Sequence, residues 1–537
     1  MGAGIDPRKI LVIRTHRMGD ILQVTPMIRG LRERYPGASI SVLVAEGFAE
    51  ALKGNPDVDT VIPFPRVAWI DRFRSGEKID WGGYREIRDL VRRLRRERFD
   101  LVINRQFTDF EAYLTSLIAP AALRGKVMDG QGNIRYADAV TKRVVADTMA
   151  FGRNPALVNL VDLSCEVAGV SPSERRLIFS VSPEVRTACR KRLMDRGIPP
   201  ERPLYGIQPG ASRSFKKVEN DSLAVVVDYL VERKEGAVLL FGTGEERPAG
   251  DTLLRRLGPG ADSVLNLMGE TTLEELGGFL SFCNLLVTGD TGTVHVAAAV
   301  GTPTLSASYG MTYPYETAPY GLGHLILYSD LACAPCDDPD DCPHEMACRG
   351  VLRPEVMARG IDLAHALAAG EDEEVRRLRQ DPIFRSVRLL YTGRAPVTPP
   401  LKLCDLRVEV PPLPVSAKPP TLDRETSHPK PALESVEVFD TLEQIRSSVS
   451  AAVDAFSGGD KGGGFQAILP VFDLMSGVIG RIGIAELPSG LLPLLNRLGQ
   501  VMERMDITLL QELLVREMLP MLDEMEQRSA EDLKKMF

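Results

Sequence analysis

Short apolar runs and amphipathic stretches alternate through the first part of the chain. Near its start, the run "KILVI" precedes a polar turn, an amphipathic stretch that ends near Tyr35 and Pro36, and the β-branched run "SISVLVA". Short continuous apolar runs predict buried strands, and apolar residues at steps of three and four predict helices. The segment "EIRDLVRRLRRERFDLVINRQ" repeats the helix-then-strand order. This alternation predicts a parallel sheet with helices on both faces.

The same rhythm restarts after a charged helix and a proline-rich turn, and we place a domain boundary there. Strands are predicted at "PLYGI", "AVLLF", "SVLNL", "NLLVTG" and "TPTLSAS", with helices between them. The prediction is an α/β fold with two Rossmann-like β/α domains, residues 1–190 and 200–370, that face a cleft at the carboxyl ends of their strands.

The pattern changes again at about Arg394. Prolines punctuate residues 394–432 without periodicity, which predicts an extended linker. Residues 433–537 carry apolar residues at helical steps and predict an all-α helical bundle. Its methionines are interpreted as core or as a partner surface; they include Met502, Met505, Met518, Met521 and Met525. We expect the bundle to dock a protein partner or a second copy of the chain.

Length and charge narrow the class of protein. The 537 residues exceed the roughly 250–300 that one core supports. A net charge of −8 argues against a general nucleic-acid binder. No stretch approaches the ~20 apolar residues that span a bilayer, and the N-terminus lacks the apolar middle of a signal peptide. The prediction is a cytoplasmic enzyme, with room for peripheral contact with the inner membrane.

The stretch "VTGDTGTVHVAAAVGTP" joins the end of a predicted strand to the start of a helix. Asp290, Thr291 and Gly292 fall at this junction, where free N–H groups and the helix dipole attract anions, and Gly292 leaves space for a phosphate. The alternative is that Asp290 or Thr291 only caps the helix. His295, one turn further on, is by itself more often a packed histidine than a ligand contact.

Two further strand-to-helix turns predict anion binding. The stretch "QPGASRSFKK" offers backbone donors at Gly210, a hydroxyl at Ser212 and a cation at Lys216. In "FGTGEE", the Glu245 carboxylate can accept hydrogen bonds from ribose hydroxyls. Solvated lysines and a plain turn are the respective alternatives.

In the first domain, "RTHRMGD" sets Asp20 at the start of a helix that faces the predicted cleft. A carboxylate there can accept a proton from a hydroxyl group in hydrogen-bond reach. His16 and Arg17 precede it and are candidates to hold an anionic acceptor. A capping role for Asp20 is the alternative.

Four of the eight cysteines lie in a loop rich in proline and aspartate, residues 331–350. They are Cys333, Cys336, Cys342 and Cys348. In a reducing compartment, four thiolates on a short loop suit tetrahedral zinc or iron. Four cysteine ligands leave no open position, so the predicted metal is structural. Free thiols packed under the loop are the alternative.

Taken together, these motifs resemble glycosyltransferase family 9, the lipopolysaccharide heptosyltransferase family, over roughly Lys9 to Ala368. The resemblance rests on "ILVIRTHRMGDILQVTPMIRGLRERYP", "FDLVINRQ", "GIQPGASRSFKK", "GDTGTVHVAAAVGTPTLSASYG" and "CAPCDDPDDCPHEMACRG". It implies a GT-B type fold, with an acceptor domain followed by a nucleotide-sugar donor domain. It also implies an inverting, metal-independent transfer, most often of heptose from ADP-heptose, to a hydroxyl of a cell-surface glycan precursor or protein.

The resemblance implies roles for single residues. Asp20 matches the family's proposed catalytic base, and Lys216 matches its diphosphate-binding lysine. The family's donor-binding D-T-G-x-x-H matches Asp290, Thr291, Gly292 and His295. Glu245 is the best match for the acid that contacts ribose. No catalytic cofactor is implied, although sequences similar to autotransporter heptosyltransferases bind iron through a related cysteine set.

The sequence departs from the family in two places. After the Gly-Ala turn the family has Lys-Arg-Trp-Pro, whereas this chain has Lys216-Lys217-Val218-Glu219, and the lost aromatic bears on donor specificity. The insertion from Arg66 to Tyr84 is longer than expected and bears on the acceptor side. Two alternatives stay open: the same fold with a UDP- or GDP-sugar donor, and a non-catalytic nucleotide-binding scaffold that acts through its helical bundle.

Overall fold

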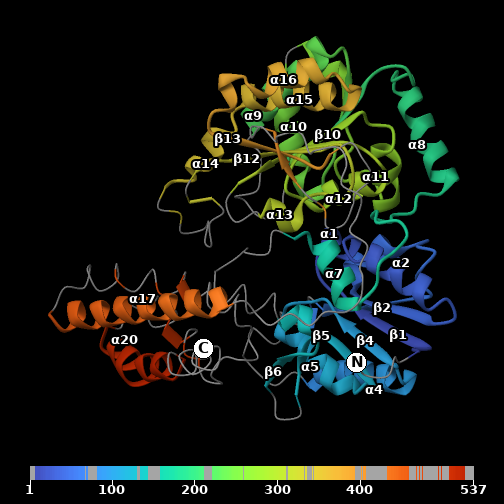
Figure 1. The fold of residues 1–537 in the computed structure, drawn as a ribbon. Helices are drawn as coiled ribbons and strands as arrows, with labels where there is room; N and C mark the ends of the chain where they lie inside the picture. Colours follow the sequence, from blue (N-terminus) through green and yellow to red (C-terminus); the bar gives the residue numbers. More distant parts are fainter. Residues whose placement is uncertain are drawn as a thin grey trace, which may run out of the picture. The chain divides into compact units, whose positions relative to one another are not determined.

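The structure is a computed structural model, shown in Figure 1. It describes residues 6–66, 68–69, 81–129, 133–142, 158–210, 220–257, 259–309, 313–331, 333–334, 342, 344–393, 401, 403–406, 432–458, 467, 471, 474–475, 491, 494, 497–498 and 507–525. The chain divides into two compact units, of which the first comprises residues 1–142 and 157–411. Within the described residues, no helix has the length and apolar character needed to cross a bilayer.

The first sheet lies in the first unit and has the strand order β3-β2-β1-β4-β5-β6. Neighbouring strands run parallel, except for the antiparallel pair β5 and β6. The strands are β1 (Lys9–Ile13), β2 (Ser39–Ala45), β3 (Thr60–Phe64), β4 (Leu101–Asn104), β5 (Ala122–Met128) and β6 (Ile134–Tyr136). The apolar runs at residues 9–13 and 39–45 therefore form adjacent buried strands, as the sequence predicts.

Helices cover both faces of the first sheet (Figure 1). On one face lie α4 (Trp81–Glu97) and α5 (Asp109–Ile118), whose apolar residues share a buried cluster with Leu11 and Ile13 of β1. On the other face lie α1, α2 and α7. Their bounds are Met18–Leu22, Thr25–Arg34 and Leu160–Ala168, and the short helix η1 (Glu46–Leu52) follows β2.

The second sheet has the strand order β14-β13-β12-β11-β10-β7-β8-β9. Its parallel strands are β7 (Leu204–Gln208), β8 (Ala237–Leu240), β9 (Val264–Asn266), β10 (Leu285–Gly289), β11 (Thr304–Ser308) and β12 (His324–Ser329). The antiparallel strands β13 (Val387–Tyr391) and β14 (Cys404–Asp405) extend one edge. The helices around this sheet are α9 (Asn220–Asp228), α10 (Arg247–Arg256), α11 (Leu273–Leu280), α12 (Gly292–Ala299), α14 (Ala347–Val351), α15 (Pro354–Ala369) and α16 (Asp372–Arg379).

The second sheet region reaches beyond the limits expected from the sequence, residues 200–370. Strands β13 and β14 lie after residue 370, and β14 falls inside the segment predicted as a linker, 394–432. Helix α8 (Pro183–Asp195) packs on α11, where a Cβ added at Gly278 would lie 2.9 Å from Cys189 Sγ. Most of the residues of α8 fall within the range 1–190 assigned to the first domain. Neither β14 nor α8 carries a long apolar run from which its packing against β13 or α11 could be predicted.

The second compact unit has its own apolar cluster. It includes residues of α17 (Ala432–Ser457), of α20 (Ile507–Leu513) and of the turn that continues it, Leu514–Met518. Met518 and Met525 are buried in this cluster and Met521 packs against it, which agrees with the interpretation of these methionines as core. Met502 and Met505 lie outside the described residues. The bundle topology for residues 433–537 stays a prediction.

Candidate functional site

The first turns of α1 and α12 touch each other within the first unit. A Cβ added at Gly19 would lie 2.4 Å from His295 Cδ2, closer than real Cβ contacts come. A Cβ added at Gly292 would lie 2.8 Å from Met18 Cε. A side chain at Gly19 would collide with the buried His295 ring, whereas one at Gly292 would require only the flexible end of Met18 to move. Helix α1 begins five residues after β1 ends, and α12 begins three residues after β10 ends, so the carboxyl end of each strand leads into it. The structure thus brings the Asp20 turn and the turn at residues 290–292 together.

Asp20 lies in the first turn of α1, and its side chain is 27% exposed. The Arg14 guanidinium holds it twice: Nη2 lies 3.1 Å from Asp20 Oδ2, and Nε donates to the Asp20 carbonyl at 3.3 Å. Within the described part of the chain, Oδ1 has no hydrogen-bond partner. One carboxylate oxygen is therefore fixed and the other is available to accept a proton.

Two buried arginines lie under this turn, and sequence reasoning missed both. Arg14 follows β1 and Arg105 follows the neighbouring strand β4, and Arg14 Nη1 donates to the Arg105 carbonyl. Both guanidinium groups lie over the Phe107 ring, at 5.9 and 5.6 Å from its centroid. Burial, together with the Arg14 charge, lowers the pKa of Arg105 to about 9. The signal in the sequence is an arginine close behind each of two apolar runs, "LVIR" and "LVINR".

His16 and Arg17 lie between β1 and α1, beside Asp20 in the chain. His16 is half-buried, and its Nδ1 has no hydrogen-bond partner among the described residues. Burial and the charges of Arg66 and Arg17 lower the pKa of His16, which favours its neutral imidazole. Arg17 is exposed and has φ of 66°, a left-handed conformation that is costly for a residue other than glycine. The acceptor-binding role of both residues stays a prediction.

A buried ion pair anchors the turn after β1. Glu111 is fully buried, and its Oε1 accepts hydrogen bonds from Arg66 Nε and Thr15 Oγ1, both at 2.6 Å. Because Thr15 immediately precedes His16, these bonds fix the backbone that leads into α1. Arg66 is also the first residue of the insertion noted in the sequence, so that insertion begins at this buried ion pair.

On the donor side, three turns follow the adjacent strands β10, β7 and β8. Thr291 is the N-cap residue of α12 but makes no side-chain capping bond; its hydroxyl lies 3.3 Å from that of Thr288. The Thr291 side chain therefore does not occupy the first N–H groups of α12, a position where the helix dipole attracts anions. His295 is 6% exposed and packs against Gly19.

The other donor-side predictions have different outcomes. Gly210 follows β7, and a Cβ there would lie 1.9 Å from Glu246 Oε1. Glu246 also accepts a hydrogen bond from Thr243 N at 2.8 Å. Glu245 is exposed in the turn Gly244–Glu246, and its contact with ribose stays a prediction. Ser212 and Lys216 lie outside the described residues.

The cysteine loop does not show a metal centre in its described part. Cys333 is exposed, while Cys342 is partly buried and its Sγ accepts a hydrogen bond from Met346 N at 3.4 Å. Cys348 is buried in the apolar core of the second sheet region. Among the described residues, no three His, Cys, Asp or Glu side chains form a group that could hold an ion. Cys336 lies outside the described residues, and we assign no chemistry to a metal here.

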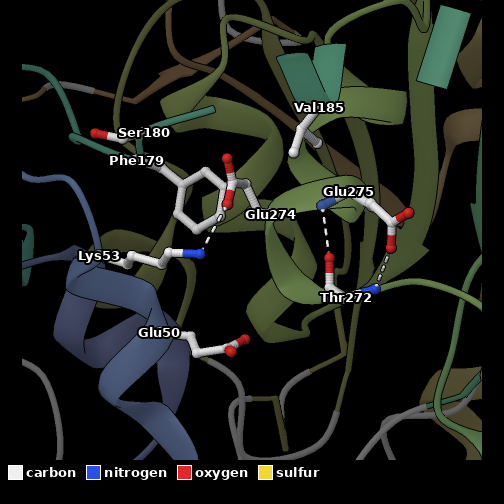
Figure 2. A pocket seen from close by; sticks show the side chains of 8 residues that line it. All are labelled: Glu50, Lys53, Phe179, Ser180, Val185, Thr272, Glu274 and Glu275. Atoms are coloured by element: carbon white, nitrogen blue, oxygen red, sulfur yellow. Dashed lines mark hydrogen bonds and ion pairs between the residues drawn. The ribbon is translucent and has the colours of Figure 1, made fainter. Parts of the chain in front are cut away.

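A pocket of about 340 Å³ lies between η1 and the start of α11 (Figure 2). Glu274 links three segments at this pocket: it accepts bonds from Ser182 N and Oγ at 3.0 and 2.7 Å and pairs with Lys53 at 3.2 Å. These bonds, those of Ser182 first, lower the pKa of Glu274 to about 2. Ser180 Oγ donates to the Gly54 carbonyl at 2.7 Å. Ser180 and Ser182, which lie in the chain between the two sheets, are therefore hydrogen-bonded to the segment after η1 and to the start of α11, respectively.

Comparison with known proteins gives a consistent result. The sequence model of glycosyltransferase family 9 (heptosyltransferase) matches residues 87–345. Lipopolysaccharide heptosyltransferase 2 of Salmonella typhimurium is 30% identical over 318 residues, which cover 58% of this chain and 85% of the relative. Lipopolysaccharide heptosyltransferase 1 of Pseudomonas aeruginosa is 26% identical over 332 residues, covering 61% and 86%. The crystal structure of a family 9 glycosyltransferase from Veillonella parvula is similar with a TM-score of 0.54 and 18% identity, covering 66% of this chain and 97% of that one, and this likeness concerns the fold.

Proposed function

Since this chain belongs to glycosyltransferase family 9, the heptosyltransferase family, we propose that it transfers heptose from ADP-heptose to a hydroxyl of a cell-surface glycan precursor or protein. The chain is a glycosyltransferase. Lipopolysaccharide in the names of the relatives supports a lipopolysaccharide-core acceptor over a protein. A cytoplasmic location with peripheral contact to the inner membrane belongs to the same proposal.

The contact between α1 and α12 is the observation that carries the proposal. In the reaction that we propose, Asp20 takes the proton from the acceptor hydroxyl as its oxygen bonds to the anomeric carbon. The bond to the diphosphate breaks on the opposite face, so the sugar configuration inverts and ADP leaves. In this proposal, the charge that develops on the leaving diphosphate is stabilised by the start of the α12 dipole and by Lys216.

Arg14 supports the role of Asp20 as a positioning residue. Its guanidinium is itself held by the Arg105 carbonyl and is only 6% exposed, so it has little freedom to move. It therefore fixes the direction in which the free Oδ1 of Asp20 points. A general base needs this fixed geometry in addition to a suitable protonation state.

Replacing Asp20 by asparagine tests the proposal, because it keeps the shape and removes the base. We expect turnover of ADP-heptose with a lipopolysaccharide-core acceptor to fall roughly 100- to 10,000-fold. Binding of ADP, measured by calorimetry, should stay the same, because Asp20 acts on the acceptor. Glu46→Gln, an exposed carboxylate change at the same edge of the sheet, is the matched control and should leave turnover unchanged.

The same preparations separate the rival functions. ADP should raise the melting temperature of the protein, since a ligand that binds only the folded state stabilises it, whereas UDP and GDP should not. Stabilisation by UDP or GDP instead would assign a different donor. An Asp20→Asn protein that turns over as fast as the unmodified protein would contradict the assignment of the base.

A further inference from the structure

Helix α4 carries a concentration of positive charge that is unusual for this chain. Between Arg85 and Arg98 there are seven arginines and three acidic residues, a net charge of +4 in a protein whose net charge is −8. The apolar residues of the helix, among them Leu90 and Leu94, are buried against the first sheet. The arginines point the other way. We call the set Arg85, Arg88, Arg92, Arg93, Arg95 and Arg96 the arginine face.

Nearby carboxylates neutralise only part of the arginine face. Glu86 accepts a hydrogen bond from Trp69 Nε1 at 2.7 Å, and Glu97 pairs with Lys9 at 2.9 Å. Asp89 pairs with two members of the face, at 3.1 and 3.9 Å, and their side chains are 39% and 61% exposed. Among the described residues, the exposed arginines of this face without an acidic partner are Arg93, Arg95 and Arg96.

Exposed apolar side chains lie on the neighbouring helix of the same layer. Helix α5 packs beside α4 (Figure 1), and its Tyr113 and Leu117 are 46% and 47% exposed. Their spacing of four residues puts both side chains on one side of the helix. Guanidinium groups beside exposed aromatic and aliphatic side chains are the combination that binds a lipid–water interface.

We infer that the arginine face, with Tyr113 and Leu117, docks onto the anionic headgroups of a membrane surface. The charges of the face complement such a surface, and the two apolar side chains favour lipid over a purely ionic polyanion such as nucleic acid. Helices α4 and α5 cover the face of the first sheet opposite to α1 (Figure 1). Docking through them therefore leaves the start of α1 uncovered. This inference rests on the peripheral membrane contact of the proposed function and names the surface that makes it. Vesicle binding is measured separately from sugar transfer, so a failure of docking can be told from a failure of the transfer reaction.

Flotation of the full chain with vesicles tests the inference. We expect binding to phosphatidylcholine vesicles that contain phosphatidylglycerol, no binding to pure phosphatidylcholine, and weaker binding as salt increases. The triple variant Arg92→Gln, Arg93→Gln, Arg96→Gln should bind roughly 100-fold more weakly. The matched control is Arg255→Gln, Arg256→Gln, Arg376→Gln, which removes three exposed arginines from α10 and α16 and should bind as the unmodified chain does.

A second variant tests the apolar part. Tyr113→Ser with Leu117→Ser should weaken vesicle binding several-fold at high salt, where the ionic contribution is screened. Circular dichroism and ADP binding should be unchanged in both variants, which separates loss of docking from loss of folding. Equal binding to neutral vesicles, an equal loss in the control variant, no vesicle binding at all, or tighter binding of the same arginines to duplex DNA would each overturn the inference.

Discussion

At the scale of single residues, the contact between the two halves of the candidate site lies at two glycines. Gly19 and Gly292 let the first turns of α1 and α12 approach until the atoms of one helix fill the space where the other would carry a Cβ. The neighbour of Gly19, the His295 ring, has no wide space to move into, because His295 is buried. Protein interiors are close-packed, so an added methyl group would displace one helix start from the other.

Gly19→Ala should therefore separate Asp20 from the donor-side turn. We expect the free energy of unfolding to fall by about 1–3 kcal/mol. We also expect transferase activity to fall by at least tenfold, because about 1 Å of misplacement costs that much or more. Gly37→Ala is the control, since a Cβ there meets nothing within 4 Å. Thermal melts and steady-state rates measure both effects, and an active, unperturbed Gly19→Ala protein would show that the contact is not needed.

At the scale of elements, local pattern predicts strands and helices but not their partners. The runs at β1, β4, β7 and β10 are apolar enough to identify buried strands, and Asp20 and Asp290 were found because they follow such runs. The pairing of Arg14 with Arg105 was missed because it depends on β1 and β4 being neighbours, which no local stretch encodes. Strand β14 was missed because two residues, Cys404–Asp405, carry no period.

The hydrogen bonds between Ser182 and Glu274 lead to a prediction about the pH dependence of stability. Hydrogen bonds from Ser182 and the Lys53 charge lower the pKa of Glu274 from its ordinary value of 4.5 to about 2. A lowered carboxyl pKa adds stability above pH 4.5 that is lost as the pH falls towards 2. Glu274→Gln should therefore lower the free energy of unfolding at pH 7 by about 1–3 kcal/mol, measured by urea denaturation. The difference from the unmodified protein should narrow below pH 4.5. Glu50→Gln changes an exposed carboxylate in the same pocket, and its free energy of unfolding should equal that of the unmodified protein at every pH.

At the scale of the whole molecule, a segment near the end of the first compact unit is hydrogen-bonded to one of its early helices. Asp162 of α7 is 2% exposed and accepts hydrogen bonds from Arg175, from Tyr320 Oη at 2.8 Å and from Leu401 N at 2.8 Å. Leu401 is itself buried. The Asp162 carboxylate of α7 therefore accepts hydrogen bonds from two residues of the second sheet region: Tyr320, between β11 and β12, and Leu401, between β13 and β14. Proline composition in residues 394–432 gave no sign of this, because a single buried leucine leaves no pattern.

Two truncations test how much the contact of Leu401 with α7 stabilises the first unit. A chain that ends at residue 411 keeps Leu401 and β14, and its melting temperature should match that of the first unit in the full chain. A chain that ends at residue 393 loses both. It should be less stable by about 2–5 kcal/mol, because it exposes a buried leucine site and removes one donor from a buried carboxylate. Scanning calorimetry measures the difference, and equal melting temperatures would contradict the role of Leu401.

The distance along the chain between Asp162 and its hydrogen-bond donors also has a consequence for biosynthesis. Arg175 follows it within 13 residues, but Tyr320 and Leu401 are 158 and 239 residues further along. As the nascent polypeptide leaves the ribosome, the residues of the first sheet emerge early, yet this carboxylate gains its last hydrogen-bond donor only after residue 401 has been translated. A nascent chain stalled before residue 401 would therefore hold the Asp162 carboxylate without its Leu401 donor.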